Sequence, residues 1–254
     1  MISALLIGAM ILATIAAAAL LLAPRLDEGR TVFDLRPDRP YAFGYGMSWM
    51  AIRTRDTQRV IDSLGLGAVQ PANWNTGLGA VYSPELGTTQ MFVSPPVNGW
   101  TFVVGQCLPQ PLGKTFTDKA TPLLLDLGGK FIEVQYYFCT PEIDFLGWAR
   151  VIDGKIVRAF AIGDEGVLWN RGKPTKEEMS LGLKLFELRG VRGRRGDAGA
   201  EIVLYPTEAH VMHLAGKWSL DPTRVNTQVV DPALGYVGRA PVAWRAERHR
   251  KAAA

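Results

Sequence analysis

The stretch GWARVI-DG-KIVRAFAI, residues 147–162, decides the fold class of this chain. Both flanks are rich in apolar and β-branched residues, and the Asp-Gly pair between them is typical of a tight type I′ turn. The sequence therefore predicts an antiparallel hairpin at these residues. The remaining elements are placed by working outward from it.

Residues 131–139, just before this hairpin, alternate in a pattern that predicts a strand. One face of that strand is expected to carry Ile132, Val134, Tyr136 and Phe138. The opposite face carries Glu133 and Gln135. We expect Glu133 to meet Arg150 or Arg158 of the neighbouring hairpin, because opposite charges pair across strands.

A second hairpin is predicted nearer the N-terminus. Its turn is Asn98-Gly99, which separates MFVS (91–94) from TFVVG (101–105). Asn-Gly between two apolar runs is a strong hairpin signal. MSWMAIR, residues 47–53, predicts one further strand.

Three short helices are predicted outside these strands. One of their N-caps begins a capping box, with a Glu three residues later. The expected N-caps are Asp56, Thr175 and Thr207, and the expected helix ends are Gly65 and Gly216. These signals follow the preference for Ser, Thr and Asp at helix starts and Gly after helix ends.

Strands dominate the middle of the chain and helices its ends, without regular β-α alternation. This order predicts an α+β fold with a largely antiparallel sheet and flanking short helices. We place the globular domain at residues 43–240 and a basic tail at 241–254. Residues 67–89, rich in Gly and Pro, are expected to be irregular.

A single N-terminal transmembrane helix is predicted to precede this domain. Residues 2–23 carry no charge and are long enough to cross a bilayer as a helix. We therefore assign 1–24 as an anchor and 25–42 as a polar linker; a cleaved signal peptide is the alternative. Basic residues follow the span and none precedes it, which predicts a cytoplasmic C-terminal domain. These residues are Arg25, Arg30, Arg36 and Arg39.

The net charge of +4 is concentrated in two basic runs, near residues 189–195 and 245–251. No aromatic platform or recognition helix accompanies these runs, so nucleic acid is not an expected partner. The two cysteines, Cys107 and Cys139, could form one disulfide outside the cytoplasm or remain thiols inside it.

The sequence offers no recognised catalytic constellation or cofactor motif, so we expect no cofactor and lean against an enzyme. His210 and His213 are spaced so that both could bind one metal ion, but no third ligand accompanies them. No metal site is therefore expected. Glu133, His210 and His213 are kept as weak candidates for a general acid or base.

Aromatic residues gather in segments rich in Asn, Ser, Gly and Pro. Such composition is typical of recognition surfaces, although a Trp in a loop is also often part of the core. The candidate binding residues are Trp74, Tyr82, Asn98, Trp100 and Trp218.

Four phrases of the sequence resemble a family of uncharacterised bacterial proteins: FGYGMSWMAIRT, VQPANWNTGL, MFVSPPVNGWTFVVG and AGKWSLDPT. The resemblance covers most of residues 43–223 and transfers no catalytic residue. In its general style the domain is similar to toxin-neutralising immunity proteins. The expected function is a non-catalytic protein-recognition module, single-pass in the bacterial inner membrane. The alternatives are a membrane-associated enzyme acting on a small or lipid-like substrate and a structural subunit of a membrane complex.

Overall fold

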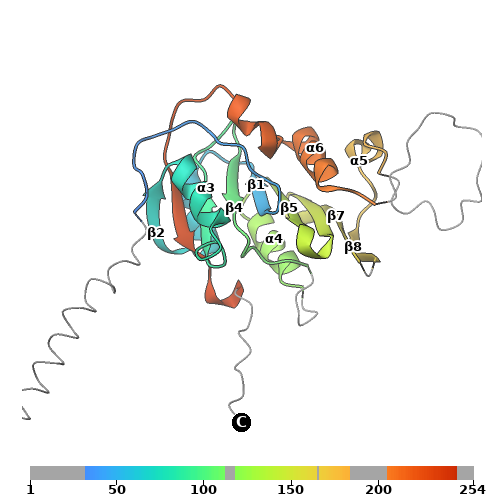
Figure 1. Ribbon diagram of the computed structural model, residues 1–254. Helices are drawn as coiled ribbons and strands as arrows, with labels where there is room; N and C mark the ends of the chain where they lie inside the picture. The colour runs from blue at the N-terminus through green and yellow to red at the C-terminus, as the bar shows by residue number, and fades with distance from the viewer. Residues whose placement is uncertain (1–31, 112–117, 165, 184–204, 245–254) are drawn as a thin grey trace, which may run out of the picture. The chain divides into compact units, whose positions relative to one another are not determined.

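The computed structural model describes residues 32–111, 118–164, 166–183 and 205–244 (Figure 1). The chain divides into two units, Met1–Phe33 and Asp34–Ala254, and the fold described below belongs to the second. The predicted membrane span at residues 2–23 lies outside the described residues. Within the described ranges, no helix combines the length and the apolar character that crossing a membrane requires.

One antiparallel sheet runs through the domain, which confirms the predicted α+β class. Its strand order is β2-β9-β3-β4-β1-β5-β6-β7-β8, and every neighbouring pair is antiparallel. The strands of the described residues are β1 (Ser48–Ile52), β2 (Gly67–Ala72), β3 (Gln90–Val93), β4 (Thr101–Val104), β5 (Glu133–Thr140), β6 (Phe145–Ile152), β7 (Lys155–Gly163), β8 (Gly166–Arg171) and β9 (Gly235–Arg239).

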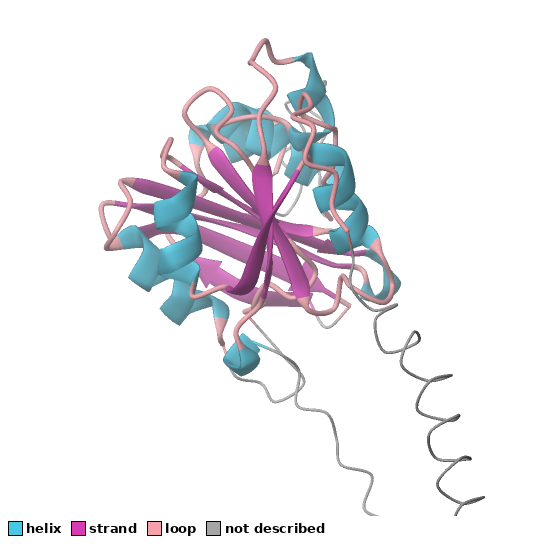
Figure 2. Ribbon diagram, turned by 90° about the vertical axis from the view of Figure 1, so that its left-hand side faces the viewer, coloured by secondary structure: helices cyan, strands magenta, loops and turns pink. Residues whose placement is uncertain are grey.

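Short helices lie on both sides of the strands (Figure 2). The α-helices of the described residues are α2 (Thr57–Leu64), α3 (Trp74–Tyr82), α4 (Ala120–Gly128), α5 (Lys176–Ser180) and α6 (Glu208–Trp218). Three 3₁₀ turns complete the list: η1 (Pro141–Ile143), η2 (Pro222–Thr227) and η3 (Val242–Trp244).

Both predicted hairpins are present, and their turns have the predicted backbone. Asp153 and Gly154 have φ of 47° and 74° between β6 and β7. Asn98 and Gly99 have φ of 49° and 86° between β3 and β4. Positive φ at both central residues is what a type I′ turn requires, and Asn, Asp and Gly tolerate it best.

The predicted helix boundaries are confirmed in most respects. The Asp56 side chain accepts from the Arg59 backbone N–H, and Gly65 ends α2 in the left-handed conformation. Thr175 forms the expected capping box at the start of α5. Thr207 is the N-cap of α6, and this helix continues two residues past Gly216.

The two faces of the sheet are both covered, which explains why β5 is buried along nearly its whole length. Val134, Tyr136 and Phe138 share the expected face, in one core cluster with residues of α2 and α4. Glu133 and Gln135 lie on the opposite face, where α6 packs against β5 and β6. Ile132 precedes the strand and is exposed, so its predicted place on the apolar face was wrong.

Most of residues 67–89 are not irregular, contrary to the prediction, because residues 67–82 form β2 and α3; residues 83–89 form turns. β2 is an edge strand that pairs with β9, which is more than 160 residues away in sequence, and local patterns carry no sign of that partner. Asn73 caps α3 by accepting from the Thr76 backbone N–H at 3.0 Å. The Asp38 carboxylate accepts two further N–H groups at the start of α3, at 2.7 and 3.0 Å. Part of the segment assigned as a linker is therefore bonded to the domain.

Candidate recognition site

Two of the tryptophans predicted to bind a partner belong to the core. Trp74 is only 1% exposed and packs edge-on against Phe92, with ring centroids 5.3 Å apart. Trp218, the last residue of α6, is 6% exposed and packs near Tyr137. Neither indole is available as an exposed anchor, because burial in the fold already uses its apolar surface.

Tyr82, the last residue of α3, bonds to the loop that contains Gly44 and Tyr45. Its hydroxyl accepts from the Gly44 backbone N–H at 3.0 Å and donates to the Tyr45 carbonyl at 3.3 Å. Burial raises the pKa of Tyr82 above its usual value. These contacts give Tyr82 a structural role, although 41% of the residue is exposed.

Trp100, Trp218 and Glu133 are brought together by two arginines. We call these five residues the arginine–tryptophan cluster: Arg53, Trp100, Glu133, Arg150 and Trp218. The Arg53 guanidinium lies over the Trp100 ring, 5.9 Å from its centroid, and that of Arg150 lies 5.5 Å from the Trp218 centroid. The Glu133 carboxylate lies between the arginines, 2.7 Å from Arg150 Nε and 3.5 Å from Arg53 Nη1.

Of the two arginines expected as partners of Glu133, Arg150 is the one that pairs with it. The neighbouring polar groups are hydrogen-bonded as well. Gln135 Nε2 donates to Glu133 Oε1 at 2.8 Å and to the Trp218 carbonyl at 3.1 Å. The Tyr137 hydroxyl donates to Gln135 Oε1 at 2.9 Å, and burial raises the pKa of Tyr137 well above its usual range. Buried polar groups must be paired in this way to avoid the cost of desolvation.

This geometry gives Glu133 a structural role. Its Oε1 already accepts from both Gln135 and Arg150, and the residue is only 4% exposed. A general base needs an accessible carboxylate oxygen that faces a substrate. The observed arrangement therefore supports an ion pair that ties β5 to β6 more directly than it supports acid–base chemistry.

Arg53 is the outward-facing member of the cluster. Its side chain is 61% exposed, and its closest carboxylate contact is the 3.5 Å approach to Glu133. Among the described residues, the Arg53 side chain makes no hydrogen bond shorter than 3.5 Å. A guanidinium has five N–H donors, so Arg53 keeps donors directed to solvent while the Trp100 ring restricts its position.

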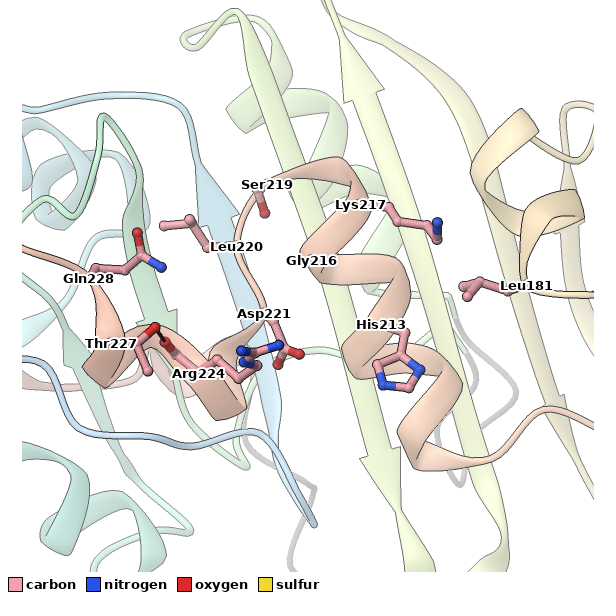
Figure 3. A pocket seen from close by; sticks show the side chains of 10 residues that line it. All are labelled: Leu181, His213, Gly216, Lys217, Ser219, Leu220, Asp221, Arg224, Thr227 and Gln228. Carbon is pink, nitrogen blue, oxygen red and sulfur yellow. Dashed lines mark hydrogen bonds between the residues drawn. The ribbon is translucent and has the colours of Figure 1, made fainter.

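An open pocket of about 460 Å³ lies between α6 and η2 (Figure 3). Its walls include His213, Gly216 and Lys217 of α6 and Arg224, Thr227 and Gln228 at η2. The predicted binding residue Asn98 reaches its rim, because Asn98 Nδ2 donates to Gln228 Oε1 at 2.6 Å.

The two histidines of α6 have separate surroundings. His210 Nδ1 accepts from the Thr207 backbone N–H at 3.1 Å and helps to cap the helix. His213 lines the pocket instead. In the described ranges, no group of three or more His, Cys, Asp or Glu side chains could hold a metal ion.

A buried ion pair was missed by the sequence analysis. Arg158 was a candidate partner for Glu133, but its Nε instead donates to both Glu178 oxygens, at 2.8 and 2.9 Å. Both side chains are 0% exposed. Trp148 Nε1 also donates to Glu178 Oε1 at 2.9 Å, so the capping-box glutamate of α5 ties that helix to β6 and β7.

Cys107 and Cys139 are both thiols in this structure, which leaves the disulfide unmade. Burial raises the pKa of the Cys139 thiol. A thiol with a raised pKa is less reactive as a nucleophile, which favours a structural role for Cys139.

No family model, curated protein or solved structure matches the chain. The resemblance carried by its sequence phrases therefore stays a prediction, and function is argued from the site.

Proposed function

We propose that this protein is a non-catalytic recognition module that binds an acidic segment of a protein partner through Arg53 and Trp100. The observation that carries the proposal is the exposed Arg53 guanidinium, which lies over the Trp100 ring and has only a 3.5 Å contact with the Glu133 carboxylate as its ion pair among the described residues. Arginine and tryptophan are the side chains most often found at the energetic centres of protein interfaces.

Contacts within the domain fix the residues on both sides of Arg53. Val97 and Trp100 exchange two backbone hydrogen bonds, of 2.8 and 3.0 Å, across the tip of the β3–β4 hairpin. Arg150 Nε lies 2.7 Å from Glu133 Oε1, whereas Arg53 Nη1 lies 3.5 Å from Glu133 Oε2, so Arg53 is the weaker partner of that carboxylate. A pre-oriented guanidinium can bind a partner's carboxylate through two parallel hydrogen bonds, with less loss of side-chain entropy.

The proposal includes anchoring at the bacterial inner membrane. Residues 2–23 would form a single-pass helix, and the domain would face the cytoplasm. The uncharged run and the four arginines that follow it support this placement. If the module is immunity-like, its partner is a toxin, and expression of the protein would protect a cell that produces that toxin.

The two alternative functions make different predictions. An enzyme using Glu133 would lose turnover when Glu133→Gln leaves the fold intact, whereas a recognition module would keep its partner. A structural subunit would migrate in one stable complex under all conditions. The recognition module would associate with its partner in a salt-dependent way, because screening weakens exposed charge pairs.

The test is quantitative capture of partners by the full-length, tagged protein from membranes of its native host. We expect at least one acidic protein to be enriched by the wild type and reduced about tenfold or more by Arg53→Glu, since charge-assisted hydrogen bonds are worth roughly 1.5–3 kcal/mol. Trp100→Ala should reduce capture as well. Arg55 is exposed on the same loop, so Arg55→Glu is the matched control and should retain the partner.

Equal capture by the Arg53→Glu and Arg55→Glu proteins would contradict the proposal, because both variants change the net charge by the same amount. Circular dichroism of each variant establishes that the domain remains folded. A partner captured equally well at high salt would favour the structural-subunit alternative.

A further inference from the structure

The guanidinium assigned to a partner's carboxylate also faces a carboxylate of its own chain. Arg53 Nη1 lies 3.5 Å from Glu133 Oε2, and the Arg53 side chain is 61% exposed. The Glu133 side chain is only 6% exposed, so its carboxylate stays within the domain. Glu133 and a partner's carboxylate therefore approach the same guanidinium, one from inside the domain and the other from solvent.

The two oxygens of Glu133 have different surroundings. Oε1 accepts from Arg150 Nε at 2.7 Å and from Gln135 Nε2 at 2.8 Å. In the described part of the chain, Oε2 accepts no hydrogen bond and has only the contact with Arg53. That separation of 3.5 Å is longer than the 2.7–2.9 Å that is typical of a hydrogen bond between a guanidinium and a carboxylate. The ion pair of Glu133 with Arg53 is therefore incomplete.

Arg150 holds Glu133 from a fixed position. Its side chain is 22% exposed, and its guanidinium lies 5.5 Å from the centroid of the Trp218 ring. Gln135, the second donor to Glu133 Oε1, also donates to the Trp218 carbonyl at 3.1 Å. Both donors are thus tied to the end of α6, and the position of the carboxylate relative to Arg53 follows from theirs.

We infer that Glu133 competes with the partner's carboxylate for Arg53, and that Arg150 is the positioning residue that limits this competition. The inference rests on the proposed function and names what sets the affinity of the same site. Because Arg150 occupies Oε1, Arg53 keeps only an incomplete ion pair within the chain. An acidic segment that forms direct hydrogen bonds with Arg53 replaces that pair.

The competition predicts effects of opposite sign for two residues of one ion pair. Glu133→Gln removes the competing charge but keeps an amide oxygen that can accept from Arg150 and Gln135. This change should tighten binding of an acidic segment about twofold to fivefold, the range for loss of a partly exposed ion pair. Arg150→Met leaves Glu133 free to pair closely with Arg53 and should weaken binding about fivefold or more.

The double variant Glu133→Gln with Arg150→Met separates competition from a general effect of charge. It has the same net charge as the wild type, so an effect of total charge alone would give wild-type affinity. Competition predicts tighter binding than wild type, because no carboxylate of the chain then faces Arg53. The double variant also leaves neither Glu133 nor Arg150 as an unpaired charge, so it tests the inference even where Arg150→Met lowers stability.

The experiment measures the affinity of the full-length protein in neutral detergent for a labelled oligoglutamate peptide, by fluorescence anisotropy. Physiological ionic strength is used because it screens isolated exposed charges. Asp126→Asn on α4 adds the same charge as Glu133→Gln and should leave the affinity unchanged, since Asp126 pairs with Lys130 and not with Arg53. Arg53→Glu reports on the underlying site, and circular dichroism establishes that each variant is folded.

Tighter binding by Glu133→Gln and by the double variant supports the inference. If Arg53→Glu weakens binding but Glu133→Gln does not tighten it, the inference is overturned and the proposed function stands. A double variant that binds as the wild type does would also overturn the inference alone. Equal binding by the wild type and Arg53→Glu, including no binding by either, would overturn the proposed function and the inference together.

Discussion

Neutralising Glu178 should destabilise the domain strongly, because it leaves the Arg158 charge buried without an anion. Both side chains are 0% exposed, and Arg158 Nε lies 2.8 and 2.9 Å from the two carboxylate oxygens. Removing one partner of a buried pair typically costs about 3–5 kcal/mol. We therefore expect Glu178→Gln to lower the free energy of unfolding by about that amount.

The paired replacement should be much less harmful. In the double variant Arg158→Met with Glu178→Gln, no charge is buried, and the oxygen of the introduced glutamine amide can still accept from Trp148. Replacement of a whole buried pair by uncharged residues of similar volume is often neutral or even stabilising. The double variant should therefore lose no more than about 2 kcal/mol, less than either single variant, with an interaction energy of about 3 kcal/mol or more.

Urea denaturation of the full-length protein, followed by tryptophan fluorescence, measures these free energies. The matched control is Asp126→Asn, which breaks the exposed pair with Lys130, 2.7 Å long and with side chains 56% and 40% exposed. That change should cost less than about 1 kcal/mol because solvent screens exposed pairs. If Glu178→Gln cost no more than Asp126→Asn, or if the single costs simply added in the double variant, the reasoning would be refuted.

Two further predictions concern packing and pH. Gly77→Ala in α3 should destabilise the domain by about 1–3 kcal/mol, because a Cβ at this position would overlap the Phe92 ring. Gly79→Ala meets open space and should be neutral or stabilise the helix by up to about 1 kcal/mol. Thermal or urea unfolding of the two variants compares their free energies of unfolding. Burial raises the pKa of both Tyr136 and Tyr137 in the folded protein. The stabilisation from each neutral hydroxyl is therefore complete below about pH 10, where the unfolded tyrosine is also neutral. Above that pH the free energy of unfolding should fall by about 1.4 kcal/mol per pH unit for each tyrosine. Tyr136→Phe should therefore flatten the fall in unfolding free energy between about pH 10 and 12, and an unchanged slope would contradict this assignment.

Several elements could be predicted from sequence because their signals are local. Asp153-Gly154 and Asn98-Gly99 predicted both hairpin turns, since few residues accept positive φ at two successive positions. Caps at Asp56 and Thr175 predicted helix starts in the same way. Alternation along one strand and proximity of the next hairpin predicted that Glu133 meets an arginine of that hairpin, with Arg150 and Arg158 both left as candidates.

Other features depended on register that no local pattern reveals. A tight two-residue turn would place Arg150 opposite Val157, but a bulge between Arg150 and Val151 shifts the ladder and places Arg150 opposite Arg158. Two like charges that face each other across strands repel, so each arginine needs its own carboxylate. Arg150 takes Glu133 from β5, and Arg158 takes Glu178 from α5.

The tryptophans show why composition predicted the candidate site only in part. Trp74 sits in a Gly- and Asn-rich segment that looks like a loop, yet it begins α3 and packs on Phe92. Trp100 remains partly exposed under Arg53. The sequence around Trp74 and Trp100 does not show which of the two is buried, because the exposure of each indole depends on which distant element covers it.

The sequence by itself determined the antiparallel character of the sheet, both hairpin turns and three helix starts, because these depend on φ preferences and hydrogen bonds within a few residues. Tertiary structure alone decided that helices cover both faces of the sheet and that β2 pairs with β9. It also decided which arginine meets which carboxylate and how Lys217, Arg224 and Gln228 line one pocket. These outcomes depend on contacts between residues far apart in the chain, where the free energy of burial outweighs local preference.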